Sequence, residues 1–249
     1  MKAILTAAAL TATALPAFAF DPADMNEAEK AAFGQAVREF LMANPEVLVE
    51  SINVLEERRL ADESKNDLLL VENNRDAIFN DGHSWVGGNP QGDVTLVEFI
   101  DYRCGVCKKV NPDLEKLISA DGNIRWILKE FPILTQESDL AARFAVAVQQ
   151  EAGPEAYKKA HDALMESRGP VNLESLTQLA GELGVDGKTV LNRMNTEEVS
   201  AVIRKNRQLA EQMSVMGTPT FIIEGEMLRG MPADGLEGVI ARARAAKQG

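Results

Sequence analysis

Positive charge, histidine and long hydrophobic runs are scarce in this sequence, and each shortage excludes a class of function. The 249 residues include 26 lysines and arginines against 38 aspartates and glutamates, for a net charge of −12. A surface of that sign repels phosphate backbones and anionic lipid, so we expect neither a nucleic-acid partner nor binding to a membrane surface. The hydrophobic share of 45% is ordinary for a globular protein, and the length allows one sizeable domain plus an accessory region.

The one long hydrophobic run stands at the start of the sequence. After a lysine, residues 3–15 are apolar, and Ala17-Phe18-Ala19 then offers the small residues that a signal peptidase accepts. Such a run is shorter than the roughly 20 residues that span a bilayer. A cleavable export signal over residues 1–19 is therefore favoured over an anchor helix, and we expect cleavage after Ala19 and a periplasmic mature protein.

Cys104 and Cys107 are the only cysteines of the sequence, and they stand three residues apart. A disulfide between them closes a loop too small to remove much entropy from the unfolded chain, so a purely structural bond is a poor explanation. Half of a zinc site is the other common use of this spacing. The two histidines, His83 and His161, stand far apart and do not supply a paired set of further ligands. We expect a reactive dithiol and no bound metal.

Residues 20–85 are predicted to form an N-terminal helical region. Asn26 followed by Glu29 is typical of a helix cap with its capping-box partner, and Asn44-Pro45 predicts the end of one helix and the start of the next. Apolar residues recur at helical spacing at Phe33, Ala36, Val37, Phe40, Leu41, Leu48, Ile52 and Leu55. They are too few for a core of their own. They pack either on the main domain or, as we favour, against other copies in a dimer or trimer.

Turn-forming residues mark the start of the main domain, which we place at 86–249. Residues 87–92, Gly-Gly-Asn-Pro-Gln-Gly, are expected to form the boundary loop. Residues 94–100 are nearly all apolar and rich in β-branched side chains, which is typical of a strand buried on both faces. A helical pattern and a second strand over 124–128 follow. The cysteines therefore stand at the strand-to-helix turn of a βαβ unit.

Helical patterns dominate the rest of the main domain. Residues 136–213 are predicted helical, with breaks at three glycine-containing turns. A short hairpin over 221–229 and a closing helix over 236–246 complete the domain. The predicted fold class is α/β.

The position of the two cysteines at the head of a helix predicts redox chemistry. Unpaired backbone N–H groups and the positive end of the helix dipole stabilise a thiolate there. One turn later, a second thiol can attack a mixed disulfide. We therefore predict Cys104 as the nucleophile and Cys107 as the resolving thiol, with no cofactor beyond the disulfide that they form. The neighbouring Arg103 and Lys108 add positive potential unless they are merely solvated.

Glu98 is a carboxylate inside the predicted strand over residues 94–100. Burial of a carboxylate is costly unless the protein uses it. Because Glu98 lies six residues before Cys104, the strand and turn can carry it beneath Cys107. There we predict that it accepts the proton of the resolving thiol. The competing interpretation is an outward-pointing residue on an edge strand.

These motifs resemble the thioredoxin superfamily. The matching residues are Val97-Glu98-Phe99, Cys104-Gly105-Val106-Cys107, Pro112 and Gly217-Thr218-Pro219-Thr220-Phe221. In that superfamily an x-Pro-x segment that enters a strand carries a cis proline opposite the disulfide. The resemblance therefore implies that Pro219 is cis, and that the backbone of Thr218 pairs with a client strand by β-augmentation.

The distance between the two motifs is similar to that of the DsbA-type branch. About 110 residues, mostly predicted helical, separate the cysteines from Pro219. In that branch a helical domain is inserted into the thioredoxin fold. Residues 129–134, Lys-Glu-Phe-Pro-Ile-Leu, and the alanine-rich helix after Ser138 are also similar to it. The resemblance covers roughly residues 86–247 and implies a thioredoxin fold with an inserted helical domain at about 136–213.

The N-terminal region has a resemblance of its own. Residues 40–50 are similar to the helical leader of ScsC-like and Com1-like members of the DsbA family. In some of these proteins the leader builds a homotrimer. The resemblance thus implies an oligomerisation region ahead of the thioredoxin domain.

The same residues favour an isomerase or reductase over a strong oxidase. Direction depends on how well the Cys104 thiolate is stabilised. DsbA-type oxidases typically carry Pro-His between the cysteines, whereas Gly105-Val106 supplies no imidazolium. Threonine before the cis proline, here Thr218, is the choice of the isomerases DsbC and DsbG, which also oligomerise. The implied partners are unfolded or misoxidised exported proteins and a membrane redox protein that recycles the dithiol.

Two further functions stay open from the sequence. One is a DsbA-like dithiol oxidase. The other, from a different class, is a periplasmic chaperone or metal-handling protein on a thioredoxin fold. The presence of both cysteines together with Glu98 argues against a fold that has lost its redox function.

Overall fold

The computed structural model describes residues 25–248. The predicted export signal over residues 1–19, with its cleavage after Ala19, lies outside the described residues. Within the described part, every helix is too short or too polar to span a bilayer. The chain divides into two compact units, one up to Arg59 and one from Leu60 on.

The first unit contains α1 (Glu27–Ala43) and the first part of α2 (Glu46–Asn73). The predicted capping box is confirmed: Asn26 Oδ1 accepts from the N–H groups of Ala28 and Glu29, and the Glu29 carboxylate accepts from the N–H of Asn26. The predicted break at Asn44-Pro45 is also confirmed, because α1 ends and α2 begins on either side of it. Local sequence signals therefore set these helix ends.

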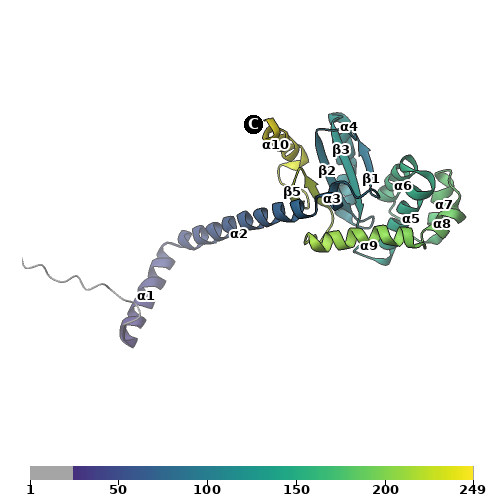
Figure 1. The fold of residues 1–249 in the computed structure, drawn as a ribbon. Coiled ribbons are helices and arrows are strands. Elements are labelled where there is room, and N and C mark those ends of the chain that lie inside the picture. The colour runs from purple at the N-terminus through teal and green to yellow at the C-terminus, as the bar shows by residue number, and fades with distance from the viewer. Residues whose placement is uncertain (1–24, 249) are drawn as a thin grey trace, which may run out of the picture. The chain divides into compact units, whose positions relative to one another are not determined.

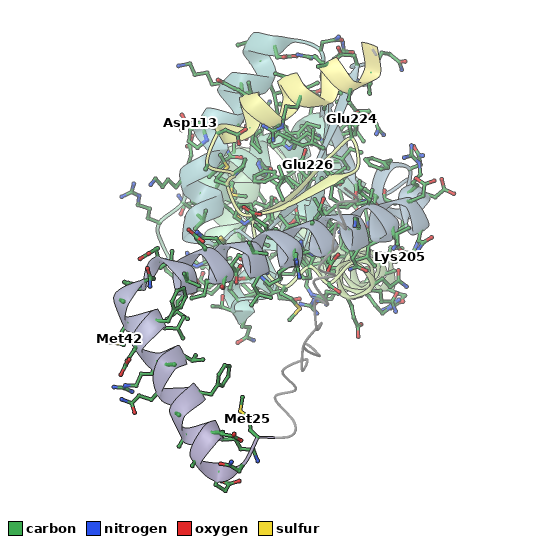
Figure 2. All side chains as sticks on the ribbon, turned by 90° about the vertical axis from the view of Figure 1, so that its left-hand side faces the viewer. Met25, Met42, Asp113, Lys205, Glu224 and Glu226 are labelled. Atoms are coloured by element: carbon green, nitrogen blue, oxygen red, sulfur yellow. The ribbon has the colours of Figure 1, made fainter. Side chains whose placement is uncertain are left out.

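Helix α1, whose two ends lie near the labelled Met25 and Met42 in Figure 2, has no buried residue. The exposed fractions of its apolar side chains are large, 57% for Phe40 and 72% for Met42. The same holds for the start of α2, where Leu48, Ile52 and Leu55 are exposed. Apolar surface of this extent is typical of a region that packs against another molecule.

A five-stranded mixed sheet forms the centre of the second unit, in the order β1–β3–β2–β4–β5 (Figure 1). The strands are β1 (Trp85–Gly88), β2 (Val94–Ile100), β3 (Ile124–Glu130), β4 (Thr220–Ile223) and β5 (Glu226–Arg229). Strands β2 and β3 are parallel, and the other neighbours are antiparallel. The predicted strand at 94–100 and the predicted hairpin are confirmed. The strand predicted at 124–128 continues to Glu130.

Strand β1 corrects the prediction that residues 87–92 form a boundary loop. Gly87 and Gly88 belong to this strand and pair with β3. A Cβ at Gly87 would stand 1.9 Å from Cη2 of the Trp85 ring, and one at Gly88 would stand 2.3 Å from the carbonyl oxygen of Ile124. These glycines are therefore strand residues that allow close approach, rather than breakers of structure.

Residues 60–81 pack on one face of the sheet. The end of α2 and α3 (Arg75–Phe79) bury Val71 and Ile78 against apolar side chains of the strands. Arg229 donates to both carboxylate oxygens of Asp67, at 2.5 and 2.8 Å. The compact unit thus begins at Leu60, ahead of the domain start predicted at residue 86.

The remaining helices of this unit lie mainly on the opposite face, although the C-terminal end of one of them, over residues 197–212, packs on the same face as residues 60–81. These helices are α4 (Gly105–Asp121), α5 (Gln136–Ala152), α6 (Pro154–Glu166), α7 (Leu173–Glu182), α8 (Gly187–Arg193), α9 (Glu197–Gln212) and α10 (Gly235–Gln248). Helices α5 to α9 correspond to the predicted insertion at 136–213 (Figure 1). The predicted α/β class, a thioredoxin fold with inserted helices and a helical N-terminal region, is confirmed.

Candidate active site

The turn between β2 and α4 carries the two cysteines. Cys104 is the N-cap residue of α4, and its Sγ accepts a hydrogen bond from the N–H of Cys107 at 3.3 Å. A sulfur here occupies the place that a serine or aspartate oxygen takes in other helix caps. Both cysteines are free thiols in the structure.

Cys104 has a strongly acidic thiol. Its pKa is lowered from 9.0 to about 5, chiefly by the hydrogen bond from the Cys107 thiol, while burial works in the opposite direction. Thr218 and the backbone N–H groups of Cys107 and Val106 lower this pKa further. With 7% of its surface exposed, Cys104 can be reached from solvent. At neutral pH the arrangement favours a thiolate on this sulfur.

Cys107 lies below it and has no exposed surface. Its pKa is raised far above the ordinary value, first because its thiol proton is shared with Cys104 and then because it is buried. The nearby charge of Glu98 raises this pKa as well. The pair is therefore unequal, with one accessible thiolate and one protonated thiol beneath it.

Glu98 lies in the middle of the sheet, with 1% of its surface exposed. It pairs with Leu128 of β3 on one side and Phe221 of β4 on the other, which excludes the edge-strand interpretation. Burial raises the pKa of Glu98 to about 8, and the charge of Cys104 raises it as well. The Nε1–H of Trp126 donates to the Glu98 carboxylate at 3.3 Å and lowers this pKa in part. The structure thus brings Glu98 and the two cysteines into one electrostatically coupled group.

Thr218 and Pro219 face the first cysteine from the segment before β4. The peptide bond between them is cis, as the resemblance implied. The carbonyl oxygen of Thr218 lies 3.2 Å from Cys104 Sγ and accepts a hydrogen bond from this thiol in its protonated form. The buried Thr218 hydroxyl meets no described partner at hydrogen-bonding geometry, although it is near enough to lower the pKa of Cys104.

Arg103 and Lys108, which flank the cysteines, bind carbonyl groups at and beyond the end of α6. Arg103 donates to the carbonyl oxygen of Gly169 at 3.0 Å and pairs with Glu137. Lys108 donates to the carbonyl oxygens of Leu164, at 2.8 Å, and Ser167. Burial lowers the pKa of Lys108. Both cations therefore fasten the cysteine turn to the helical insertion.

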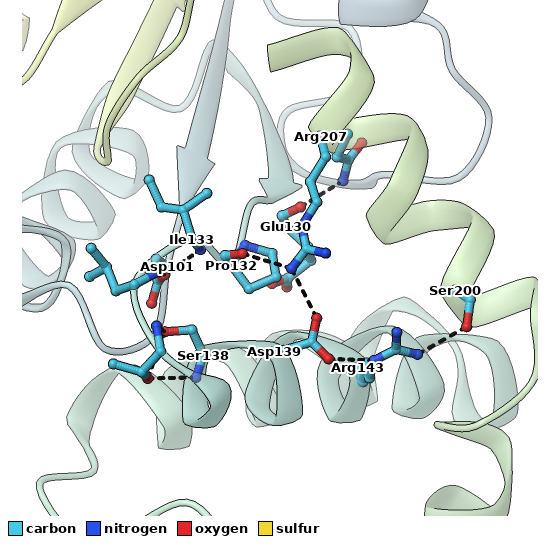
Figure 3. Close-up of polar contacts among 12 residues, drawn as sticks. Asp101, Glu130, Pro132, Ile133, Ser138, Asp139, Arg143, Ser200 and Arg207 are labelled. Carbon is cyan, nitrogen blue, oxygen red and sulfur yellow. Dashed lines mark hydrogen bonds and ion pairs between the residues drawn. The ribbon is translucent and has the colours of Figure 1, made fainter. Parts of the chain in front are cut away.

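Asp101, which the sequence interpretation missed, organises the turn. This carboxylate has 1% of its surface exposed and accepts from the backbone N–H groups of Arg103 at 2.7 Å and Leu134 at 3.1 Å. It also accepts from the N–H of Ile133 at 2.9 Å (Figure 3). Its own carbonyl oxygen accepts from the N–H of Cys104. An aspartate directly after a buried strand was the available signal. Asp101 joins the cysteine turn to the segment that follows β3.

A second buried polar group surrounds Glu130 at the end of β3. The hydroxyl oxygens of Tyr102 and Tyr157 lie 2.7 and 2.6 Å from Glu130 Oε1. His161 Nδ1 lies 3.3 Å from the Tyr102 hydroxyl, and its Nε2 lies 3.1 Å from Asn111 Oδ1. Sequence reasoning missed this group as well, because its members come from four separate segments.

Exposed apolar side chains belong to the segments next to the thiol. Val106 is 50% exposed and Met216 is 87% exposed. Ile133 and Leu134, whose backbone is held by Asp101, are exposed as well. Single exposed apolar residues are common, and these four are notable because they come from the segments that hold the cysteines, the contacts of Asp101 and the cis proline.

Among the described residues, one group has the composition of a metal site: Glu115, His161 and Asp162. The ammonium of Lys158 already bonds both carboxylates, at 3.1 and 2.6 Å. Neither cysteine belongs to this group. The arrangement is that of an ion-pair cluster, in which the lysine supplies the positive charge.

Comparison with protein families adds two matches. The model of a DSBA-like thioredoxin domain matches residues 95–240. The model of the copper resistance protein ScsC N-terminal domain matches residues 29–61. The first match covers more than half of the chain, and the second lies within the predicted leader.

Solved structures of thioredoxin-like proteins are similar to this chain as well. The chain is 39% identical to a thioredoxin-like oxidoreductase from Silicibacter pomeroyi DSS-3, with a TM-score of 0.64 over 69% of this chain and 98% of that one. It is 34% identical to a periplasmic thioredoxin-like protein from Salmonella enterica serovar Typhimurium, with a TM-score of 0.62 over 69% and 95%. Proteus mirabilis ScsC in a transitional conformation is 26% identical, with a TM-score of 0.65 over 89% and 100%.

Curated relatives include much longer proteins. The chain is 28% identical over 145 residues to the Na(+)/H(+) antiporter NhaA 1 of Salinispora arenicola. It spans 22% of the length of that protein.

Proposed function

Because this chain belongs to the family of DsbA-like thioredoxin-domain proteins, whose members are thiol–disulfide oxidoreductases, we propose that it exchanges disulfides in exported proteins. Its preferred direction is isomerisation or reduction. Cys104 is the nucleophile, Cys107 the resolving thiol and Glu98 the proton acceptor, and the segment around Thr218 and Pro219 binds the client. No cofactor takes part beyond the disulfide of the two cysteines.

The observation that carries this proposal is the inequality of the two sulfurs. Cys104 sits at the head of α4 with a pKa lowered to about 5, chiefly by the hydrogen bond from the Cys107 thiol. Cys107 is buried, and its pKa is raised. A nucleophile that is ionised at neutral pH, with a protonated partner directly behind it, suits a two-step exchange.

The exchange can be written so that every bond balances. The Cys104 thiolate attacks one sulfur of a client disulfide; a mixed disulfide forms, and the other client sulfur leaves as a thiolate. For reduction, Cys107 loses its proton and attacks Cys104 Sγ, which releases the second client thiolate and leaves the Cys104–Cys107 disulfide. For isomerisation, a client thiolate attacks the mixed disulfide instead and releases Cys104 unchanged.

Glu98 is suited to take the Cys107 proton at the moment it must leave. Its pKa of about 8, raised first by burial, is raised in part by the charge of the Cys104 thiolate. Formation of the mixed disulfide removes that charge, so the pKa of Glu98 falls. The carboxylate becomes a base at the step at which Cys107 needs one.

The client is held by backbone and apolar contacts. The carbonyl oxygen of Thr218 lies beside Cys104 and can accept from the N–H of an extended client strand. Proline at position 219 has no N–H of its own. The exposed side chains of Val106, Leu134 and Met216 offer apolar contact to a chain that has not folded.

Three features favour isomerase or reductase over oxidase. Gly105 and Val106 between the cysteines supply no cation to the thiolate. Thr218 precedes the cis proline. The exposed apolar side chains of α1 and early α2, in a region that matches the ScsC N-terminal domain, support assembly into a dimer or trimer. An assembly of this kind shields its active sites from the partner that would oxidise them.

The proposed location is the periplasm, after removal of residues 1–19. The support is the sequence of that segment and the similarity to a periplasmic thioredoxin-like protein of Salmonella. The clients are unfolded or misoxidised exported proteins. A membrane redox partner returns the dithiol to its working state.

The deciding experiment measures the Cys104–Cys107 reduction potential together with the solution mass. We expect a potential more reducing than the roughly −120 mV of a strong oxidase, an oligomeric mass, and refolding of a scrambled disulfide protein. A potential near that oxidising value with a monomeric mass contradicts the proposed direction. Insulin reduction by Cys104→Ala separates enzyme from chaperone, since a chaperone keeps its anti-aggregation activity in this variant.

A further inference from the structure

A chain of buried polar groups beneath the cysteine turn has no part in the exchange steps above. It runs from Glu130 at the end of β3 through Tyr102 in the turn and His161 in α6 to Asn111 and Glu115 in α4. Each of the first four is at least 94% buried. Polar groups buried this deeply need hydrogen-bond partners, so the position of the proton in each contact of the chain can be worked out.

The outer end of the chain fixes the orientation of Asn111. The carboxylate of Glu115 accepts a hydrogen bond from the ammonium of Lys158 at 3.1 Å. Burial raises the pKa of Glu115, but the hydrogen bonds that its carboxylate accepts outweigh burial and lower it. A carboxylate only accepts, so the amide group of Asn111 donates to it, at 2.9 Å. The amide oxygen of Asn111 is then the atom that faces His161 Nε2, at 3.1 Å.

This orientation fixes the proton on His161. Burial lowers the pKa of His161 to about 3, so the ring is neutral at physiological pH and carries one proton. Because the oxygen of Asn111 can only accept, that proton is on Nε2. Nδ1 is therefore an acceptor, and it faces the hydroxyl of Tyr102 at 3.3 Å.

The last link concerns Glu130. The Tyr102 hydroxyl has one proton to share between two contacts, His161 Nδ1 at 3.3 Å and Glu130 Oε1 at 2.7 Å. An ionised Glu130 would take that proton and leave Nδ1 without a donor. A neutral Glu130 donates to Tyr102 instead, and both contacts are then hydrogen bonds. Tyr157 donates to the same Oε1 at 2.6 Å. Oε2 is buried without a described partner, which costs less for a neutral carbonyl oxygen than for a charged one.

We propose that Glu130 is a neutral carboxylic acid and acts as a positioning residue for Cys104. Its proton begins a one-way chain of hydrogen bonds, in which each group donates to the next: Glu130 to Tyr102, Tyr102 to His161, His161 to Asn111 and Asn111 to Glu115. Tyr102 stands two residues before Cys104, so the chain ties the cysteine turn to α4 and α6. The inference rests on the proposed function only for what the turn does, and not for where the protons are.

Ionisation of Glu130 is expected to disturb this arrangement. The groups that face its carboxyl are Tyr102 and Tyr157, together with the charge of Asp101. The nearby cations bind elsewhere: Lys129 bonds Asp81, and Arg207 bonds Asp139 and the carbonyl oxygen of Pro132 (Figure 3). A negative charge on Glu130 would lack a cation and would turn the Tyr102 hydroxyl away from His161.

The pH range follows from the direction of the shift. Burial raises the pKa of Glu130 from 4.5 to about 8, against the hydrogen bonds of the two tyrosines. The neutral form therefore persists through neutral pH. The positioning of the turn should weaken above about pH 8, after the Cys104 thiolate has long been formed.

Nitrogen-15 NMR of the imidazole rings tests the proton positions directly. Replacement His83→Gln leaves His161 as the one remaining histidine of the sequence. We expect a neutral ring with its proton on Nε2 between pH 6 and 7.5, a range between the pKa of about 3 for His161 and that of about 8 for Glu130. A proton on Nδ1, or a doubly protonated ring, overturns the proposal. This measurement does not depend on any redox activity.

Matched variants test the positioning role. The rate of Cys104 alkylation is followed through pH 8 in a Glu98→Gln background. Of the two carboxyls whose pKa is raised to about 8, only Glu130 can still titrate there. We expect the rate to fall above about pH 8, and Glu130→Gln to remove that fall because an amide cannot ionise. An unchanged alkaline fall in Glu130→Gln contradicts the proposal.

Two tyrosine variants separate the chain from simple packing. Tyr102→Phe cuts the link between Glu130 and His161, whereas Tyr157→Phe removes a similar hydroxyl from the same carboxyl but leaves that link intact. We expect only Tyr102→Phe to change the proton position on His161 and to remove the alkaline fall in alkylation. Tyr157→Phe should keep that fall and move it to higher pH, because the hydrogen bond that it removes lowers the pKa of Glu130. Equal effects of the two variants contradict the one-way chain.

Discussion

The region up to Arg59 exposes apolar side chains, whereas the domain from Leu60 on buries charged ones. In the first, apolar side chains such as Ile52 and Leu55 are exposed, at 59% and 64%. In the second, charged side chains such as Glu98 and Lys129 are buried. Either arrangement is costly unless something compensates for it. In the domain the compensation is internal hydrogen bonding, whereas in the leader we propose that assembly with other copies supplies it. The contrast supports the proposed separation of chemistry in one region from assembly in the other.

The largest expected effect tests whether the chemistry is confined to the domain. Cys104→Ala should abolish insulin reduction, because no other described side chain is placed to attack a client disulfide. The solution mass should not change, since the leader is intact. Cys107→Ala is the matched control: it should still attack but should accumulate the mixed disulfide, visible on a non-reducing gel. Residual turnover in Cys104→Ala would show that the nucleophile lies elsewhere.

The next effect concerns the buried carboxylate. Glu98→Gln should slow resolution of the mixed disulfide by about 10²-fold, which is the lower range for loss of a general base, and should leave the initial attack nearly unchanged. Stopped-flow measurement of the two phases checks this separation.

The same variant has a predictable effect on stability. A carboxyl whose pKa is raised from 4.5 to about 8 in the folded state, here chiefly by burial, stabilises the fold in acid. That stabilisation is lost as the pH rises from 4.5 through about 8. Glu98→Gln should flatten this part of the pH dependence in chemical denaturation, and an unaltered slope would argue against a raised pKa.

A variant of the leader tests the other side of the comparison. Phe40→Asp places a charge on a 57% exposed apolar position of α1 and should lower the solution mass toward that of a monomer. Insulin reduction should persist, while refolding of a scrambled disulfide protein should fall several-fold. Gln35→Asp, which adds the same charge at a polar position of the same helix, should leave the mass unchanged. If both variants keep the oligomer, the exposed stripe is not the assembly surface.

The smallest expected effect concerns Asp101, which holds the cysteine turn, and it is an effect on stability. Asp101→Asn keeps the shape of the side chain but replaces one of its two accepting oxygens with an amide, so at least one backbone N–H loses its partner. We expect a loss of about 1–3 kcal/mol in the free energy of unfolding. Asp139→Asn, a half-exposed ion-pair residue nearby, should cost less. Denaturant titration of both variants gives the comparison.

Much of this molecule follows from local sequence signals. The capping box at Asn26, the buried strand at 94–100 and the cysteines at a helix start all depend on neighbours within a few residues. The class of fold followed from the order of such elements. The placement of Glu98 near the cysteines also followed from its position six residues before Cys104, although the sequence left an edge-strand alternative open.

What could not be predicted depends on contacts between distant segments. Strand β1 was missed because the role of Gly87 and Gly88 is visible only once the Trp85 ring and the Ile124 carbonyl are in place. Asp101 and Glu130 were missed because their partners come from other segments of the chain. Residue spacing shows what is adjacent along the chain, and a buried polar group is defined by what is adjacent in space.

The complete burial of Cys107 also bears on oxidative damage. A soluble peroxide can reach Cys104 but meets no surface of Cys107, so it should form a sulfenic acid on one sulfur only. The thiol beneath can then displace the hydroxide as water and close the disulfide, before a second oxidation makes the change irreversible. Burial of one partner thus gives the site a built-in route of repair.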